Sequence, residues 1–291
     1  MIGSTGRLSF LYASLSTMRG AVLGFDDRRP NTLATDALSK VPQVTLAFWV
    51  IKILATTLGE TGGDALSMTL KLGYAVSTLI FLGFFIITLA PQVASKRYHP
   101  FLYWAVVVAT TTVGTTMSDY LDRTLKLGYV KSSIILFCGV LVVLFAWHRS
   151  MGRIEFAHIT TRPNEVFYWV TILVSNTLGT ALGDFVATTT GLGFERGSLE
   201  FAGLLALVAA AHFFTKIPKS VIFWSAYVLT RPLGATLGDT LTKSHAEGGL
   251  GLGRIISSLV IAACIVAGII VTFRWDGRSA TEPDNNPRGK S

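Results

Sequence analysis

Charged residues and cysteines are both scarce in this sequence, and each shortage excludes a class of protein. Only 14% of the 291 residues are charged, whereas soluble chains carry about 25%. Hydrophobic residues make up 51% and the mean hydropathy is +0.53. Together with apolar runs of about 20 residues, this predicts an integral membrane protein. We interpret the only two cysteines, Cys138 and Cys264, as apolar fillers within predicted spans, not as a disulfide or a metal pair.

The net charge of +8 does not indicate nucleic-acid binding. The Lys and Arg residues lie mostly in short loops and in the tail, where membrane topology accounts for them. The five histidines are scattered without ligand spacing, and the sequence has no P-loop, no dinucleotide fingerprint and no Ser-His-Asp order. We therefore predict neither an enzyme nor a resident cofactor.

One pattern occurs four times along the chain. An aromatic-Trp pair is followed ten residues after the Trp by Gly, and fifteen residues after it by an Asp that follows a small residue. The Trp and the Asp each advance by 55, 65 and 55 residues from copy to copy. Four matched carboxylates inside apolar segments are costly, so they are the best candidates for a functional site. The copies are Phe48-Trp49 with Gly59, Gly63 and Asp64; Tyr103-Trp104 with Gly114, Ser118 and Asp119; Tyr168-Trp169 with Gly179, Gly183 and Asp184; and Phe223-Trp224 with Gly234, Gly238 and Asp239.

The repeats predict an all-α integral membrane protein with eight transmembrane helices, arranged as four helix hairpins of the same orientation. The first helices are expected at about 43–68, 101–124, 164–189 and 219–243, and the second at about 73–93, 130–148, 198–214 and 252–273. The repeats span about 42–95, 97–150, 162–215 and 217–273. They form a membrane domain at 40–273, between an N-terminal cytoplasmic extension at 1–39 and a disordered tail at 274–291.

Basic residues predict the orientation of the hairpins. The loops between repeats carry Lys96, Arg97, Arg149, Arg153, Arg162, Lys216 and Lys219. The turns inside repeats carry fewer, namely Lys71, Lys126, Lys131, Arg196, Lys243 and Arg254. The positive-inside rule therefore places both termini in the cytoplasm, and we expect a bacterial inner membrane with the lipid bilayer as the main partner. The sequence leaves open whether the protein is a monomer or a homodimer.

Each first helix should carry a polar stripe on one face. With the Trp at zero on a helical wheel, the residues seven, eleven and fifteen later fall at about −20°, +20° and +60°. The candidate site residues on this face are Thr56, Thr111, Asn176, Glu60, Asp64, Asp119, Asp184 and Asp239. Carboxylate and hydroxyl oxygens are ligands for hard divalent cations, so Glu60, Asp64 and Asp119 are the candidate metal ligands.

Two basic residues, Lys52 and Arg231, break the fourfold equivalence of the first helices. Six acids, with Asp122 included, then face two bases, which leaves a formal excess of four negative charges that would bind protons or a cation. As charge partners, Lys52 and Arg231 serve either as salt bridges or as built-in counter-cations. We expect them to pair with Asp184 and Asp239.

Structural readings of the repeated residues remain open beside the functional ones. The Gly five residues before each Asp and the Gly or Ser directly before it have the small-xxx-small spacing of close helix packing. The Gly residues could also loosen the helix beside the Asp. The Asp residues could be polar glue between helices. An aromatic belt at the cytoplasmic side explains the four Trp.

An intramembrane aspartyl protease is the best enzyme alternative, but it does not fit well. That class has Gly three residues before its Asp, where this chain has Thr61, Thr116, Ala181 and Thr236. It also uses two inequivalent Asp residues, not four matched ones.

The fourfold Trp-to-Asp spacing resembles that of bacterial membrane proteins built from four tandem copies of a repeat of unknown function. The resemblance covers about 42–273 and identifies the motif tryptophans as Trp49, Trp104, Trp169 and Trp224. It implies two transmembrane segments in each repeat but no substrate. The last repeat departs from the others with Arg231-Pro232 and a longer turn.

We therefore predict a multi-pass membrane transporter of a divalent cation such as Mn²⁺, carried through a central ring of the four Asp. The first helices would line the site, the second helices would face lipid, and proton-coupled export is the favoured mechanism. Two alternatives stay open: proton-coupled transport of a small organic cation, and a membrane scaffold or sensor that transports nothing.

Overall fold

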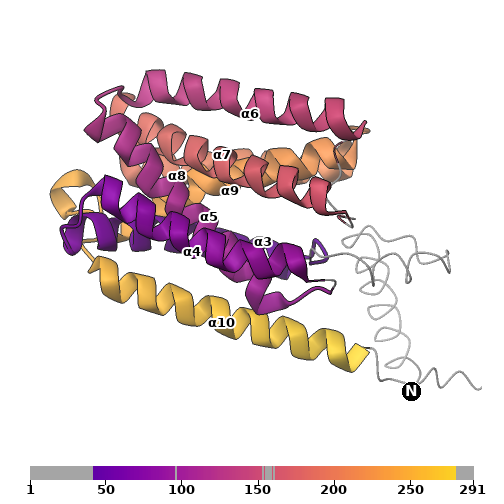
Figure 1. The fold of residues 1–291 in the computed structure, drawn as a ribbon. Helices are drawn as coiled ribbons and strands as arrows, with labels where there is room; N and C mark the ends of the chain where they lie inside the picture. Colours follow the sequence, from indigo (N-terminus) through magenta and orange to yellow (C-terminus); the bar gives the residue numbers. More distant parts are fainter. Residues whose placement is uncertain (1–41, 96, 153, 155–158, 160, 280–291) are drawn as a thin grey trace, which may run out of the picture.

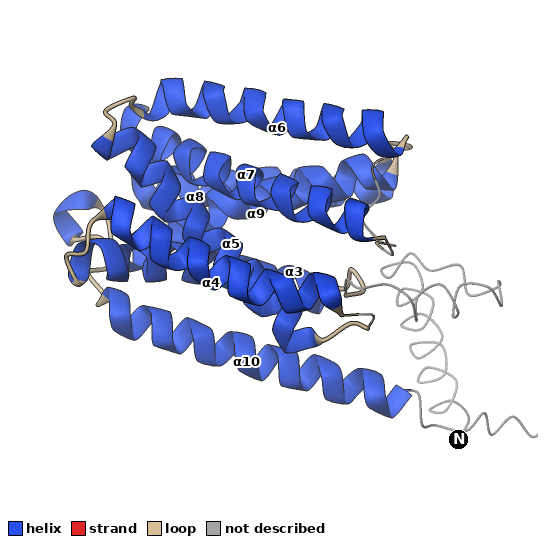
Figure 2. Ribbon diagram, in the orientation of Figure 1, coloured by secondary structure: helices blue, strands red, loops and turns tan. Residues whose placement is uncertain are grey.

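Eight long α-helices form an elongated bundle in the computed structural model, which describes residues 42–95, 97–152, 154, 159 and 161–279 (Figure 1). The part of the chain described contains no strand (Figure 2). The helices are α3 (Leu46–Asp64), α4 (Tyr74–Ala94), α5 (Pro100–Asp119), α6 (Tyr129–Met151), α7 (Arg162–Asp184), α8 (Gly193–Phe214), α9 (Lys219–Thr242) and α10 (Arg254–Ser279). They correspond one to one with the eight helices expected from the repeats.

The first and last residues of the helices differ little from those expected. Helix α8 begins at Gly193 and not at 198, and α10 continues past 273 to Ser279. The predicted N-terminal extension, Lys96, Arg153 and residues 280–291 lie outside the described residues. The turns inside the first two repeats end at Gly73 and Gly128, whose φ angles of 76° and 74° are open to glycine but strained for other residues.

The first helices of the four repeats form a closed inner ring. Helix α3 packs against α5 and α9, and α7 packs against the same two neighbours. Each second helix lies outside this ring, against the first helix of the following repeat: α4 on α5, α6 on α7, α8 on α9, and α10 back on α3. The helix bundle is thus closed, because the last hairpin, α9 and α10, packs against the first helix, α3.

Glycine sets the distance between the inner helices. A Cβ at Gly59 of α3 would overlap the side chain of Thr111 on α5, and a Cβ at Gly234 of α9 would overlap Thr56 on α3. A Cβ at Gly179 would likewise overlap the side chain of Arg231, and a Cβ at Gly114 would lie only 3.0 Å from the backbone of Asn176. Each motif Gly therefore faces the residue seven positions after the Trp of the following repeat, all the way around the ring.

The hydroxyl groups reinforce this packing. Thr111 Oγ1 donates to the backbone carbonyl of Ala55 at 3.1 Å, and Thr56 Oγ1 donates to that of Thr230 at 3.1 Å. Ala55 and Thr230 both lie one turn before a motif Gly, so the absent side chain lets the hydroxyl of the next helix reach a carbonyl.

A single π-helical turn follows the Asp in the first three repeats. These turns are Ala65–Thr69, Tyr120–Thr124 and Phe185–Thr189, whereas α9 stays α-helical to Thr242. A π turn inside a helix is rare and is often found at functional sites. Because the turn recurs directly after the motif Asp, it indicates that the level of the Asp residues is a candidate functional site.

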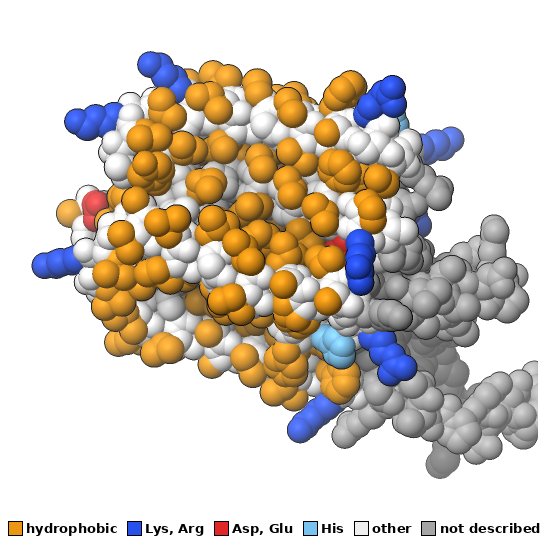
Figure 3. Space-filling view, viewed as in Figure 1, with side chains coloured by type: hydrophobic (Ala, Val, Ile, Leu, Met, Phe, Trp, Pro, Cys, Tyr) orange, Lys and Arg blue, Asp and Glu red, His pale blue; other side chains and the backbone are white. Residues whose placement is uncertain are grey.

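The outer surface of the bundle is apolar. Six helices are long and apolar enough to cross a membrane: α4, α5 with its π turn, α6, α7 with its π turn, α8 and α10. In Figure 3 hydrophobic side chains cover the middle of the bundle, and Lys and Arg side chains gather at its two ends. The inner helices α3 and α9 do not meet this criterion, because both carry charged residues in their middle turns.

The glycine contacts predict where the ring tolerates no side chain. Gly234→Ala places a methyl group against Thr56, so we expect it to destabilise the protein by about 1–3 kcal/mol. Gly62→Ala on α3 is the matched control, because its Cβ would come no closer than 3.9 Å to Thr112. Thermal unfolding of the purified protein in detergent measures both. Equal melting temperatures for the two variants would contradict the close-packed ring.

Candidate functional site

The inner ring of helices holds its polar side chains in successive layers. We call the four residues Asp64, Asp119, Asp184 and Asp239 the acidic ring, and the group Arg231, Glu60, Thr115 and Thr180 the arginine layer. A third group, the aromatic layer, contains Phe48, Trp104, Tyr103, Tyr168, Trp169 and Phe223 at the opposite end of the inner helices from the acidic ring.

The acidic ring is buried and is bridged by basic side chains. Each of its four residues is at most 2% exposed. Arg123 Nε lies 3.0 Å from Asp119 Oδ1, and its Nη2 lies 3.7 Å from Asp184 Oδ2. Lys243 Nζ lies 3.4 Å from Asp239 Oδ1 and 3.7 Å from Asp64 Oδ2. The ring therefore consists of two carboxylate pairs, each joined by one base.

A third base completes the ring from an outer helix. Arg254, at the start of α10, places Nε 3.3 Å from Asp64 Oδ2. The bridging side chains are more exposed than the carboxylates, at 31% for Arg123 and 23% for Arg254. The carboxylates are thus fixed inside the bundle, while two of their counter-charges reach its surface.

These bridges correct the charge count made from the sequence. The sequence-based count omits Arg123 and treats Lys243 and Arg254 as turn residues, whereas all three contact the acidic ring. Six acids now face five bases, so the formal excess is one negative charge instead of four. Most of the negative charge is therefore compensated by basic side chains of the protein itself in this conformation.

Asp122, which belongs neither to the acidic ring nor to the arginine layer, has hydrogen-bond partners nearby. Its carboxylate accepts hydrogen bonds from Ser132 on α6 and, at 3.3 Å, from Ser118 Oγ on its own helix. Its contacts are therefore those of a residue that joins α5 to α6.

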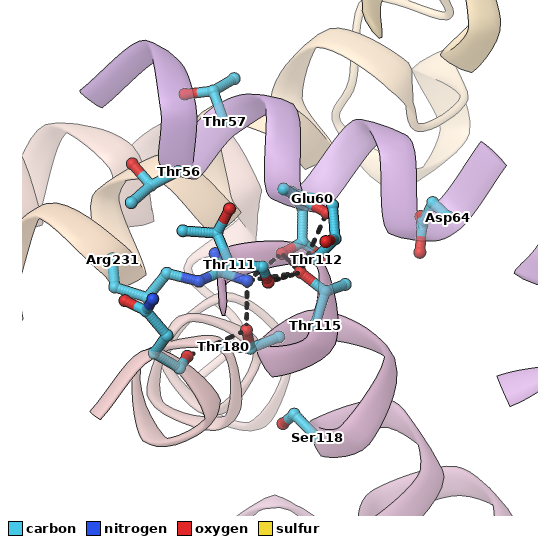
Figure 4. Close-up of polar contacts among 12 residues, drawn as sticks. Thr56, Thr57, Glu60, Asp64, Thr111, Thr112, Thr115, Ser118, Thr180 and Arg231 are labelled. Carbon is cyan, nitrogen blue, oxygen red and sulfur yellow. Dashed lines mark hydrogen bonds and ion pairs between the residues drawn. The ribbon is translucent and has the colours of Figure 1, made fainter. Parts of the chain in front are cut away.

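The arginine layer lies at the middle of the inner ring. Arg231 of α9 is fully buried, and its Nη2 donates to Glu60 Oε2 of α3 at 3.1 Å. The same nitrogen donates to the hydroxyls of Thr115 on α5 and Thr180 on α7. Figure 4 shows the guanidinium pointing into this group, with Asp64 farther along α3. One side chain therefore joins all four inner helices.

The predicted polar residues seven positions after each Trp support the ring. Thr56 and Thr111 donate to neighbouring helices, and Asn176 Nδ2 donates to Thr110 Oγ1 on α5 at 3.0 Å. All three are buried. Their hydrogen bonds hold helices together, and none of them lies in the acidic ring.

The predicted pairing of Lys52 and Arg231 with Asp184 and Asp239 is wrong. Arg231 pairs with Glu60, while Asp184 and Asp239 pair with Arg123 and Lys243. Lys52 Nζ lies 4.2 Å from the centroid of the Tyr227 ring. It makes no salt bridge with the described acids.

The motif tryptophans do not all form a membrane-interface belt. Trp104 and Trp169 are 4% and 1% exposed, and their rings contact aromatic neighbours from adjacent repeats. Tyr103 and Tyr168 share a buried hydrogen bond of 2.8 Å between their hydroxyls. This end of the ring is thus closed by packed aromatic side chains.

The repeats contain a pattern that identifies two of the bases in the acidic ring, Arg123 and Lys243. Arg123 and Lys243 both follow their motif Asp by four residues, the spacing that brings helix side chains together. The first and third repeats have Met68 and Thr188 at this position. Comparing that column of the repeats would have predicted both bridges.

The described side chains form no metal centre in this conformation. Among the described residues, no three His, Cys, Asp or Glu side chains lie together in a way that could hold a metal ion. Glu60, Asp64 and Asp119, the predicted metal ligands, each face a base in this structure.

The arginine layer predicts a strong coupling between two distant residues. Arg231→Met leaves Glu60 buried without its counter-charge, so we expect a loss of about 3–5 kcal/mol in stability. Adding Glu60→Gln should recover much of that loss, because no uncompensated charge then remains. Unfolding of the two single variants and the double variant in detergent measures the coupling. Additive losses would show that the ion pair contributes nothing.

The four repeats seen in the structure coincide with four matches to one known family. Residues 47–98, 102–153, 167–217 and 222–277 each match the family described as "Repeat of Unknown Function (DUF347)". No curated protein and no solved structure matches the chain. Because the four matches cover most of the sequence, the chain belongs to this family and consists of four tandem copies of its repeat of unknown function.

Proposed function

We propose that this protein is a multi-pass membrane transporter of a small cation, with the acidic ring as its binding site. The observation that carries the proposal is the set of four buried carboxylates at one end of the inner ring, bridged by basic side chains that reach the surface. A cation that enters from this end would replace Arg123, Arg254 or Lys243 as the counter-charge.

The arrangement of the helices supports a membrane location for the inner ring as well. Helices α3 and α9 are too polar to qualify as spans alone, but each packs between helices that do qualify. With its π turn, α3 extends over residues 46–69, which is long enough to cross a hydrocarbon layer of about 30 Å. We infer eight spans in a bacterial inner membrane, with both termini in the cytoplasm.

Two classes of cation fit different features of the ring. Carboxylate oxygens suit a divalent ion such as Mn²⁺, although such an ion would first have to displace the bridging bases. An organic ammonium or guanidinium ion is the second candidate, because the ring already accommodates the ammonium of Lys243 and the guanidinium of Arg123. Either cation would compete with protons for the same carboxylates, so we propose proton-coupled export.

Transport assays with matched variants test the proposal. In proteoliposomes, uptake of Mn²⁺ and of methylguanidinium is measured with and without a pH gradient. Asp64→Asn and Asp239→Asn should each lower uptake on the order of tenfold or more, because each removes a charge-assisted contact of about 1.5–3 kcal/mol. Glu247→Gln is the control, since this acid lies exposed in the turn before α10 and should leave uptake unchanged.

The outcomes separate the candidate functions. Uptake of only one cation identifies the substrate class. If neither cation is transported and neither binds to the purified protein at any pH, the transporter proposal fails and a scaffold or sensor remains. Equal uptake by wild type and both Asp variants would exclude the acidic ring as the site.

Membrane orientation provides a separate prediction. After replacement of Cys138 and Cys264, a cysteine at Lys216 should react with an impermeant thiol reagent only from the cytoplasmic side. A cysteine at Lys126 should react only from outside, because both positions are exposed at opposite ends of the bundle. The reverse labelling pattern would overturn the orientation.

A further inference from the structure

Between the aromatic layer and the acidic ring, three buried nitrogen atoms of two side chains are hydrogen-bond donors without an acceptor among the described residues. They are Nζ of Lys52 and the Nε and Nη1 of Arg231, none of which has a hydrogen-bond partner among the described residues. Both side chains are 0% exposed. A buried donor left without an acceptor costs on the order of 1–3 kcal/mol, and more when it is charged.

The residues at the matching positions of the other inner helices offer Lys52 no carboxylate. The positions that match Lys52 in the other three repeats are Val107, Ile172 and Tyr227. Val107 and Ile172 are fully buried, and the Tyr227 ring lies beneath the ammonium. These side chains are apolar or aromatic, so none of them offers Lys52 an anionic partner.

Lys52 and Arg231 also lie close together at the interface of α3 and α9, because the Lys52 ammonium lies over the ring of Tyr227, one helical turn before Arg231. Like charges in this arrangement repel each other. Among the described residues, Glu60 is the one carboxylate that pairs with either of them, and it contacts Nη2 of Arg231. Two positive charges and one negative charge leave this level of the bundle with a formal charge of +1. Burying an uncompensated charge is costly, so a compensating negative charge would stabilise this level.

We propose that Lys52 and Arg231 form a binding site for one small monovalent anion, a halide or a small carboxylate. The ammonium and the free edge of the guanidinium supply the donors, and the +1 charge of the layer matches a single negative charge. The anion would lie between the aromatic layer and the acidic ring. This site is independent of the cation that the acidic ring carries.

The test uses the full-length protein purified in detergent at constant ionic strength in sodium gluconate. Chloride or formate replaces gluconate stepwise, and the melting temperature is followed by tryptophan fluorescence. A ligand that binds only the folded state raises the melting temperature with its concentration. We expect a saturable rise with at least one of the two ions, and the ion that acts distinguishes a halide site from a carboxylate site.

Three variants should change the anion-induced rise in melting temperature in different directions. Lys52→Met should weaken the anion response on the order of tenfold or more, because it removes a charged donor. Glu60→Gln should strengthen it, since the layer then has a charge of +2. Lys131→Met makes the same chemical change at an exposed position of α6 and should leave the response as in the wild type.

Several results would overturn the proposal. They are the absence of a saturable response to both ions in the wild type, an unchanged response in Lys52→Met, and a weakened response in Glu60→Gln. If Lys52→Met does not fold, Lys52→Arg keeps the charge and must retain the response. Cation uptake through the acidic ring is measured separately, so its failure leaves this test intact.

Discussion

The fold depends on the close approach of four helices at their motif glycines. At each of the four interfaces, a Gly of one repeat faces the residue seven positions after the Trp of the next repeat. Since a methyl group does not fit there, the polar side chain of the neighbour is forced into the interior, where Thr56 and Thr111 find backbone carbonyls. In a membrane the lipid is as apolar as the helix surface, so small residues and hydrogen bonds of this kind drive association.

The same constraint explains how charged residues are tolerated at the centre. Glycine at position 179 leaves room for the stem of Arg231, which then reaches Glu60, Thr115 and Thr180 on the other three inner helices. The outer helices pack against the inner ring and present apolar side chains outward. Gly179 on α7 and Arg231 on α9 therefore depend on each other, because the absent side chain of one makes room for the long side chain of the other.

The sequence was sufficient for the architecture because each helix is long, apolar and repeated four times. Helix number, order and approximate ends follow from that repetition, and so does the burial of the four Asp residues. The partners of those residues did not follow. A helical wheel gives the face of one helix, but Arg231 meets Glu60 across an interface of helices 171 residues apart in the chain. The charge count failed because Lys243 and Arg254 lie at helix ends, where the sequence alone does not separate a turn residue from an inward-facing one.

The bridging bases convert a fourfold repeat into a twofold one. Arg123 and Lys243 occur in the second and fourth repeats, and each joins the Asp of its own repeat to the Asp of the next. The two bridges therefore link repeat two to repeat three and repeat four to repeat one. Both cross the boundary between the first half of the chain and the second. Under the proposed function, a cation or proton that neutralises these carboxylates would weaken both links at once, which is the condition for one half to move against the other at this end. At the opposite end, the inner helices are joined by packed aromatic side chains and by the hydrogen bond between Tyr103 and Tyr168, contacts that do not depend on the charge of a carboxylate.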